Sequence, residues 1–414
     1  MLNAKKLCLA LAALLFVFAG RVGAVELTYW CPFSGGDGEF MKEMVDSFNA
    51  AHSDIQVKML NLKSEEYYAK FRTAAISGRG PDVAIAHTSQ LSGLVKDKVI
   101  VPVEEAAGAA GIDWKNFADS VTEATFIDGK RMAVPLDTHT AVMYYNKKLI
   151  RDAGLLDASG DFQITPGMDG FMEVMATLKA KLPADVGAFA VSTEGAMCYW
   201  TWWTYYKQHA SSTLLSPDGK SADFSSPASK GALDFLVRLV DEGYFPKGVK
   251  RGGEVFKNGK VAIIYNGIWA IGDFAASPGL EFGVKPIPRV FDQDGSWADS
   301  HTFVIVKQRK PDPEKEKAVM VFADWVTEHS LPWAKAGQIP ARNSVVESAE
   351  YKAMPYRSET AKMVEIAKFL PNSDKINTIR ETCMMYINAV VVGQQKSEDA
   401  LKRIETDVNR ALQK

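Results

Sequence analysis

The chain has 414 residues, of which 47% are hydrophobic, and its 48 basic and 50 acidic residues give a net charge of −2. This balance excludes the basic surface that a nucleic-acid-binding protein needs. The length predicts two domains at roughly 150 residues each, with enough chain to bury a large core.

The first residues predict export. Lys5 and Lys6 precede an apolar run at 7–20, and small residues follow at 22–24. This pattern is typical of a secretory signal peptide cleaved after Ala24, and the run is shorter than the roughly 20 residues that span a membrane. Three bases and no acid lie in residues 1–24, so 45 bases face 50 acids afterwards, a net charge of −5. We expect the mature protein in the periplasm or secreted.

The first third of the mature chain alternates short β-branched runs with amphipathic stretches. The predicted elements are a strand at 25–29, a helix at 38–51, a strand at 55–60, a helix at 64–77 and a strand at 83–86. The first helix places five apolar side chains on one stripe and its charged residues on the opposite side. This βαβαβ order predicts an α/β lobe.

A second α/β series begins after the turn at 128–129. Extended runs at 131–136 and 141–145 flank the polar segment 137–140, where the chain could pass between lobes. The later predicted elements are a helix after Thr165-Pro166, strands at 188–192, 261–265, 281–287 and 302–306, a helix after Ser226-Pro227, and helices from Pro313 onward. Two such lobes would place a ligand in the crevice between them.

The densest aromatic stretch runs from Tyr199 to Tyr206, just after Glu194-Gly195. On a helix, Trp200 and Trp202 point in different directions, so they cannot both reach one ligand. We expect one or two of these rings to line the cleft and the rest to pack elsewhere. Aromatic faces suit the apolar C–H patches of sugar rings.

A glycine-rich loop, 33–38, joins the first strand to the first helix. Its glycines and the helix N-terminus could hold a ligand hydroxyl or an anion beside Phe33 and Asp37. The alternative is a turn in which Asp37 caps the helix. No lysine follows at the spacing of a phosphate-binding loop.

Polar residues also mark the third strand, with Asp82 at its head and His87 at its end. For His87, ligand contact and structural hydrogen bonding stay open. His139 lies in the crossing segment, and a zinc site that it shares with His87 or His301 has no supporting ligand spacing. We therefore expect no metal and no cofactor.

Aromatics with carboxylates also describe sugar hydrolases, which need two facing carboxyl groups. Candidate acids are Asp37, Asp137, Glu194 and Asp299. None stands in a recognisable catalytic arrangement, and no nucleophile elbow, metalloprotease motif or dinucleotide fingerprint occurs. The sequence predicts no catalytic residue.

Five segments together resemble the family 1 extracellular solute-binding proteins of bacterial ABC sugar importers, the maltose-binding-protein-like family. They are Gly80-Pro81-Asp82-Val83, 134–136 leading to 144–149, 256–262 followed by Asn266-Gly267-Ile268-Trp269, Ile339-Pro340-Ala341-Arg342, and the closing helix at 397–412. Their order and spacing cover essentially the whole mature chain.

The resemblance implies a type II, Venus-flytrap fold whose hinge is crossed three times, near 135–140, near 296–301 and after Pro340. The implied N-terminal lobe is 25–136 plus 300–340, and the C-terminal lobe is 140–295 plus 343–414.

The resemblance also assigns roles to particular residues. It implies that Trp269 stacks on the ligand, that His139 makes a polar contact and that Glu194 with the following aromatics lines the second lobe. The competing interpretation of Trp269 is a core side chain. Where the maltose binder's pattern leads to an aromatic, this chain has Arg380, which favours a smaller or acidic sugar.

The implied function is capture of a sugar between the lobes and its delivery to the transmembrane subunits of an ABC permease, by a protein expected to act as a monomer without nucleic acid. Two alternatives remain: a binder of another solute such as a glycerol phosphoester, held by Arg342 or Arg380, and a secreted carbohydrate-active hydrolase. The residues expected at the ligand site are Phe33, Asp37, Asp82, His87, His139, Glu194, Trp200, Trp202, Trp269, Asp299, His301, Arg342 and Arg380.

Overall fold

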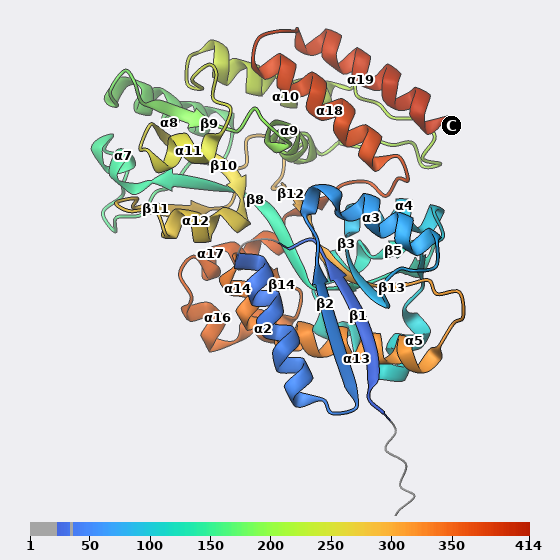
Figure 1. Ribbon diagram of the computed structural model, residues 1–414. Coiled ribbons are helices and arrows are strands. Elements are labelled where there is room, and N and C mark those ends of the chain that lie inside the picture. Colours follow the sequence, from blue (N-terminus) through green and yellow to red (C-terminus); the bar gives the residue numbers. More distant parts are fainter. Residues whose placement is uncertain (1–22, 34–35) are drawn as a thin grey trace, which may run out of the picture.

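The computed structural model describes residues 23–33 and 36–414, and it arranges them as two α/β lobes (Figure 1). The predicted signal peptide falls almost wholly outside the described residues. No helix within the described part of the chain is long and apolar enough to cross a membrane.

The N-terminal lobe is built on a six-stranded sheet of order β2-β1-β3-β13-β4, with β7 pairing β13. Its strands are β1 Val25–Cys31, β2 Ile55–Asn61, β3 Val83–His87, β4 Ile100–Val101, β7 Val134–Pro135 and β13 His301–Val306. Both β2 and β3 run parallel to β1, whereas β13 runs antiparallel to β3. The predicted βαβαβ order of this lobe is confirmed.

The helices of this lobe pack on the sheet and on each other. They are α2 Gly36–Ala51, α3 Ser64–Ile76, α4 Leu91–Lys96, α5 Glu104–Ala110, α6 Asp119–Glu123, α13 Pro313–Glu328 and α14 Leu331–Lys335, with η1 Thr88–Gln90, η2 Trp114–Asn116 and the hairpin β5 Phe126–Ile127 and β6 Lys130–Arg131. The stripe predicted on α2 is buried at Met41, Met44, Val45 and Phe48. This stripe anchors α2 to the sheet.

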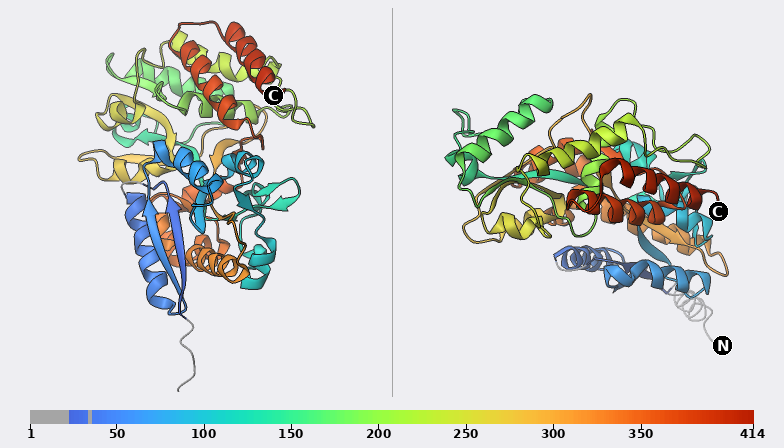
Figure 2. Two further views of the ribbon diagram at one scale, coloured as in Figure 1. Left: turned by 45° about the vertical axis from the view of Figure 1, so that its right-hand side comes forward. Right: turned by 90° about the horizontal axis from the view of Figure 1, so that it is seen from above.

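The C-terminal lobe has a seven-stranded sheet of order β15-β12-β8-β10-β9, and β11 and β14 also pair β8. Its strands are β8 Asp137–Asn146, β9 Gly187–Ala190, β10 Val261–Gly267, β11 Phe282–Lys285, β12 Ser296–Asp299, β14 Ile339–Pro340 and β15 Ala367–Phe369. Its helices are α7 Lys147–Asp152, α8 Met168–Lys181, α9 Met197–Gln208, α10 Pro227–Asp241, α11 Gly252–Lys257, α12 Ile271–Ala275, α18 Ile376–Val391 and α19 Ser397–Leu412, with η3 Ile268–Ala270. Figure 2 shows α18 and α19 lying together on this lobe.

The hinge lies where the chain leaves one sheet and enters the other, between β7 and β8 and again between β12 and β13. β7 belongs to the N-terminal sheet and β8 to the C-terminal one, so the chain crosses at Leu136. It returns at Ser300, between β12 and β13, and passes a third time between α14 and β14, close to where the Ala341 N–H donates to the Leu136 carbonyl oxygen. All ten residues of β8 are buried, polar ones included. These crossings confirm the predicted fold class and hinge.

The helices α15 Asn343–Glu347, α16 Ala349–Ala353 and α17 Arg357–Ala361, with η4 Lys362–Val364, contact both lobes. Asn343 Nδ2 donates to the carbonyl oxygen of Lys115, while Tyr356 stacks on Phe282 of β11 with ring centroids 4.7 Å apart. The assignment of all of 343–414 to the C-terminal lobe stays a prediction.

Candidate functional site at the hinge

Three of the six histidines meet at the hinge, each from a different strand. His87 ends β3, His301 begins β13, and His139 is the third residue of β8. The antiparallel register pairs His301 directly with His87. One ring nitrogen from each histidine lies within 4.8 Å of the other two. Sheet topology therefore joins residues that are far apart in the sequence.

Asp137 lies within hydrogen-bond distance of two of these rings. Its Oδ1 lies 3.2 Å from His139 Nδ1 and accepts the His301 backbone N–H at 3.0 Å. Its Oδ2 lies 2.7 Å from His301 Nδ1 and accepts the indole N–H of Trp333, also at 2.7 Å. An ionised carboxylate only accepts, so both histidines carry their Nδ1 proton toward it.

The charges in this group are strongly coupled. Burial would raise the pKa of Asp137, but the charge and hydrogen bonds of His301 and His139 hold it well below its usual range. Burial would lower the pKa of His301, yet the Asp137 charge and hydrogen bond raise it. Burial and the charge of His301 lower the pKa of His87 to about 3. Burial and the neighbouring charges therefore act on these pKa values in opposite directions.

Asp299 is the second buried carboxylate here. It accepts the hydroxyls of Thr88 at 2.5 Å and Ser89 at 2.6 Å, and the backbone N–H groups of Ser89 and Ser300 at 3.1 and 2.9 Å. Burial alone would raise the pKa of Asp299. The histidine charges and these hydrogen-bond donors lower it by more, so its pKa lies below the usual value. We refer to His87, Asp137, His139, Asp299 and His301 as the hinge cluster.

Three tryptophans from the C-terminal lobe face the hinge cluster, and we call them the tryptophan cluster. Trp200 of α9 stacks on Trp297 of β12 with centroids 3.8 Å apart, and Trp269 of η3 meets Trp200 edge-on at 5.9 Å. The Trp269 ring also meets His139 edge-on at 5.9 Å. It lies over Gly267, where a β-carbon would come within 2.1 Å of the indole, so only glycine fits beneath it.

Phe33 and Asp37 approach the hinge cluster from the N-terminal lobe. The Phe33 ring meets His301 edge-on at 5.0 Å and lies 4.7 Å from Trp333. Asp37, in the first turn of α2, accepts a 3.4 Å hydrogen bond from Gln338 Nε2, and burial raises its pKa. The structure thus brings these two predicted residues close to the histidines.

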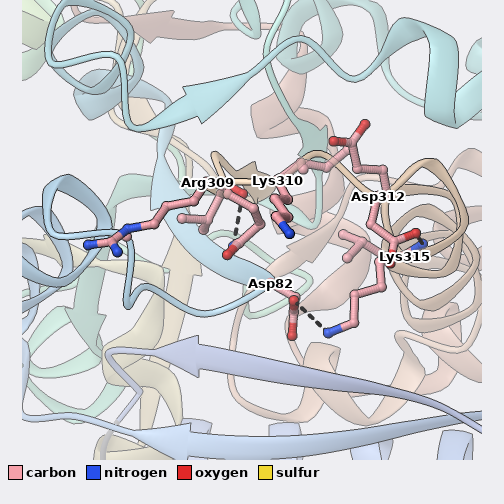
Figure 3. Close-up of a pocket in the computed structure, with 11 residues that line it drawn as sticks. Asp82, Arg309, Lys310, Asp312 and Lys315 are labelled. Atoms are coloured by element: carbon pink, nitrogen blue, oxygen red, sulfur yellow. Dashed lines mark hydrogen bonds and ion pairs between the residues drawn. The ribbon is translucent and has the colours of Figure 1, made fainter.

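Asp82, which the sequence predicts at the ligand site, lies away from the hinge cluster. It lies at the opposite end of β3 from His87, where it accepts the backbone N–H and hydroxyl of Thr28 at 2.8 and 2.9 Å. Its other oxygen pairs with Lys315 at 3.1 Å, within a surface pocket that also exposes Arg309, Lys310 and Asp312 (Figure 3). Its role is to tie β1, β3 and α13 together.

Trp202 and Arg342, also predicted at the ligand site, are both buried. Trp202 is fully buried, donates to the Ser229 carbonyl oxygen at 3.1 Å and stacks on Tyr206. Arg342 is buried against α13, where it pairs with Asp324 and donates to the Thr327 hydroxyl at 3.0 Å. Both side chains are therefore buried and already bonded to other residues of the protein.

Glu194 and Arg380 lie nearer the surface. Glu194 is exposed and pairs with Arg251 at 3.2 Å. Arg380, on α18, is exposed. Burial raises the pKa of both Tyr68 and Tyr199, and the Arg380 charge opposes that rise. Tyr68 belongs to the N-terminal lobe and Tyr199 to the C-terminal lobe, so Arg380 lies near both lobes.

The sequence reasoning missed several residues of this region. Tyr68 Oη lies 2.6 Å from His87 Nδ1 and accepts the His87 backbone N–H at 2.9 Å. Trp297 had a usable signal, because it precedes Asp299 by two residues on a strand and so shares its face. No signal in the sequence pointed to Tyr68, because the pattern of its helix does not show which strand end the helix covers.

Polar side chains also join the two lobes directly. Gln90 of η1 and Asn377 of α18 exchange two amide hydrogen bonds of 2.8 and 3.0 Å. Lys96 of α4 pairs with Asp374 nearby. We call the Gln90–Asn377 pair the amide latch.

Two α/β lobes that share a three-crossing hinge, with polar and aromatic groups converging there, define the class of two-lobed solute-binding proteins. The chain belongs to the family described as bacterial extracellular solute-binding protein, whose model matches residues 43–358. This membership confirms the family resemblance seen in the sequence.

Similar proteins include the maltodextrin-binding protein MdxE of Bacillus subtilis, 23% identical over 81% of this chain and 79% of that protein. The sn-glycerol-3-phosphate-binding periplasmic protein UgpB of Yersinia enterocolitica is 23% identical over 83% of this chain and 80% of its own length. Among solved structures, the sugar-binding protein MalE from Xanthomonas citri has a TM-score of 0.82 at 21% identity, covering 94% of this chain and 97% of that one. The cyclic alpha-maltosyl-1,6-maltose binding protein of Arthrobacter globiformis gives 0.78 at 24% identity, with 94% and 100% covered.

Proposed function

We propose that this protein is the carbohydrate-binding component of an ABC importer. It captures a sugar between its lobes and delivers it to the membrane permease without altering it. The observation that carries this proposal is the tryptophan cluster beside the hinge cluster. Indole faces cover the apolar C–H surface of a sugar ring, while buried imidazoles and carboxylates pair with its hydroxyls.

Closure around the hinge supplies the signal for delivery. A sugar that touches the tryptophans of one lobe and His87 or His301 of the other gains contacts only when the lobes are together. It therefore shifts the population toward the closed form. The permease would recognise that form, and the leader at residues 1–24 would place the protein outside the cytoplasm.

The carboxylates of the hinge cluster are poorly suited to catalysis. All four oxygens of Asp137 and Asp299 lie within hydrogen-bond distance of protein donors. Their pKa values are lowered, whereas a general acid at neutral pH needs a raised one. We therefore propose binding rather than hydrolysis.

A glycerol phosphoester is the second candidate ligand, because UgpB is among the similar proteins and Arg380 lies near both lobes. Arg342 cannot contribute, since it is paired with Asp324. An acidic sugar would use the same arginine. The sugar ring, and not negative charge, is therefore what separates the two candidates.

The test is a thermal-shift screen of the mature protein against neutral mono- and disaccharides, hexuronic acids and sn-glycerol 3-phosphate, followed by calorimetric titration of the best ligand. A ligand that binds only the native state raises the melting temperature by mass action. A neutral or acidic sugar that binds and is recovered chemically unchanged supports the proposal. Binding of the phosphoester alone, or release of reducing ends above a heat-killed control, contradicts it.

A further inference from the structure

We propose that His87, His139 and His301 bind one divalent transition-metal ion, of the zinc type, at the hinge. The sequence indicated no metal because these residues lack the short spacings of known zinc motifs. Here the three donors come from three strands that the sheet topology brings together at the hinge, so a short spacing in the sequence is not needed. The proposal needs no assumption about the sugar and goes beyond the proposed function.

The geometry of the rings fits a shared ion. Their candidate donor nitrogens lie within 4.8 Å of one another. Zinc–nitrogen bonds of about 2.0–2.1 Å place tetrahedral ligand atoms about 3.3 Å apart. Side-chain rotation that shortens the longest of these separations by about 1.5 Å would place the three nitrogens on one ion.

The partners of the rings leave the right nitrogen for a metal. Asp137 takes the Nδ1 protons of His139 and His301, so their Nε2 atoms carry free lone pairs. Tyr68 Oη lies 2.6 Å from His87 Nδ1 and so holds that ring in place by a hydrogen bond. A metal-bound histidine usually donates its other ring N–H to such a carboxylate or oxygen, which fixes the tautomer and the ring orientation.

Those lone pairs have no protein partner in the described part of the chain. His139 and His301 are only 4% and 8% exposed, and no donor lies within hydrogen-bond distance of either Nε2. Ring nitrogens that lie this close together and bond to no described residue are available to a cation or to an external donor.

The local charge also calls for a cation. Asp137 and Asp299 are buried, and no lysine or arginine among the described residues pairs with either one. A buried carboxylate without a cationic partner is costly. A divalent ion on the three histidines would balance both negative charges.

The donor set indicates which ions fit. Imidazole suits Zn²⁺, Co²⁺, Ni²⁺ and Cu²⁺, whereas Mg²⁺ and Ca²⁺ prefer oxygen ligands. Three protein ligands leave a fourth position open, as in zinc sites that take up an exchangeable ligand. The competing occupant is a sugar whose hydroxyls donate to the same lone pairs.

The test is calorimetric titration of chelator-treated, dialysed mature protein with ZnCl₂, with no sugar present. We expect one ion per chain and, with CoCl₂, the intense visible absorption of tetrahedral Co²⁺. His139→Gln and His87→Gln should each weaken zinc binding by about 100-fold or more. Loss of a residue that only supports a metal ligand already weakens binding by up to about 100-fold, and these two residues are ligands themselves. His87→Gln leaves Asp137 and its contacts in place, so it serves if His139→Gln fails to fold.

The matched control is His329→Gln, which removes an exposed histidine outside the hinge cluster and should bind zinc as the unaltered chain does. The proposal is overturned if the unaltered chain takes up no zinc, or if both hinge variants bind it equally well. Sugar titrations in chelator separate this result from the proposed function. Sugar binding without zinc uptake removes the metal site alone, and zinc uptake without any sugar ligand removes the sugar function alone.

Discussion

The two clusters at the lobe junction are held in place by different physics. The hinge cluster is fixed by hydrogen bonds to ionised groups, with Asp137 bonded to both lobes' strands and to Trp333. The tryptophan cluster is fixed by ring packing, and Trp200 and Trp269 stay partly exposed. A buried polar network loses stability when one member goes, whereas a partly exposed ring contributes mostly to what it contacts.

This contrast predicts that changes in the hinge cluster affect folding first and binding second. Changes in the tryptophan cluster should do the reverse. Three substitutions separate the two regions and the latch beside them.

Asp137→Ala should have the largest effect. It removes a buried carboxylate that four donors share and leaves the His301 and Trp333 donors unsatisfied. We expect a loss of about 3–5 kcal/mol in the free energy of unfolding, the cost of breaking a buried charged pair. Urea denaturation measures it.

The matched control for that change is Asp82→Ala, a hydrogen-bonded carboxylate at the far end of β3 that pairs with a partly exposed lysine. Its loss should cost about 1 kcal/mol. Equal costs for the two variants would show that the hinge cluster is no more critical than a surface ion pair.

Trp269→Ala should have its main effect on binding. Loss of an anchoring ring weakens ligand affinity by about 2–4 kcal/mol, while the partly exposed position limits the loss of stability to about 1 kcal/mol. Trp202→Ala is the control, because that ring is fully buried and its removal should cost about 3–5 kcal/mol of stability. Calorimetry and urea midpoints on both variants test the contrast. A large midpoint drop for Trp269→Ala with unchanged affinity would assign it to the core.

Much of this architecture was readable from the sequence, because alternating β and α patterns and the turn at 128–129 specify local structure. The polar run at 137–140 marked the hinge, since the hydrophobic pattern breaks there within an extended stretch. The site was harder. His87 and His301 become partners only through an antiparallel register that no local pattern encodes.

Three residues that the sequence predicts at the site lie elsewhere in the structure, for related physical reasons. Asp82 was assigned to the correct strand but lies at its other end, and the two ends of a strand face different environments. Helical geometry placed Trp200 and Trp202 on different sides of α9, but it could not show which side is buried. That depends on β12 and α10, which pack against α9 and are distant from it in the sequence. Arg342 looked available for an anion, yet its partner Asp324 comes from a different helix.

The smallest expected effect concerns the amide latch, which joins the lobes without belonging to either cluster. Gln90 and Asn377 exchange two hydrogen bonds across the junction, so they exist only while the lobes stay together. Asn377→Ala removes both, and a net loss of about 1 kcal/mol would raise the open-to-closed ratio about fivefold. Small-angle scattering of the ligand-free variant should give a larger radius of gyration, and saturating ligand should restore the compact value.

Asn388→Ala is the control on the same helix, because Asn388 Nδ2 donates to the Gly195 carbonyl oxygen within one lobe, and its loss should leave the radius of gyration unchanged. If both variants scatter like the unaltered chain, the latch does not hold the closed state, and closure depends on contacts at the two clusters instead.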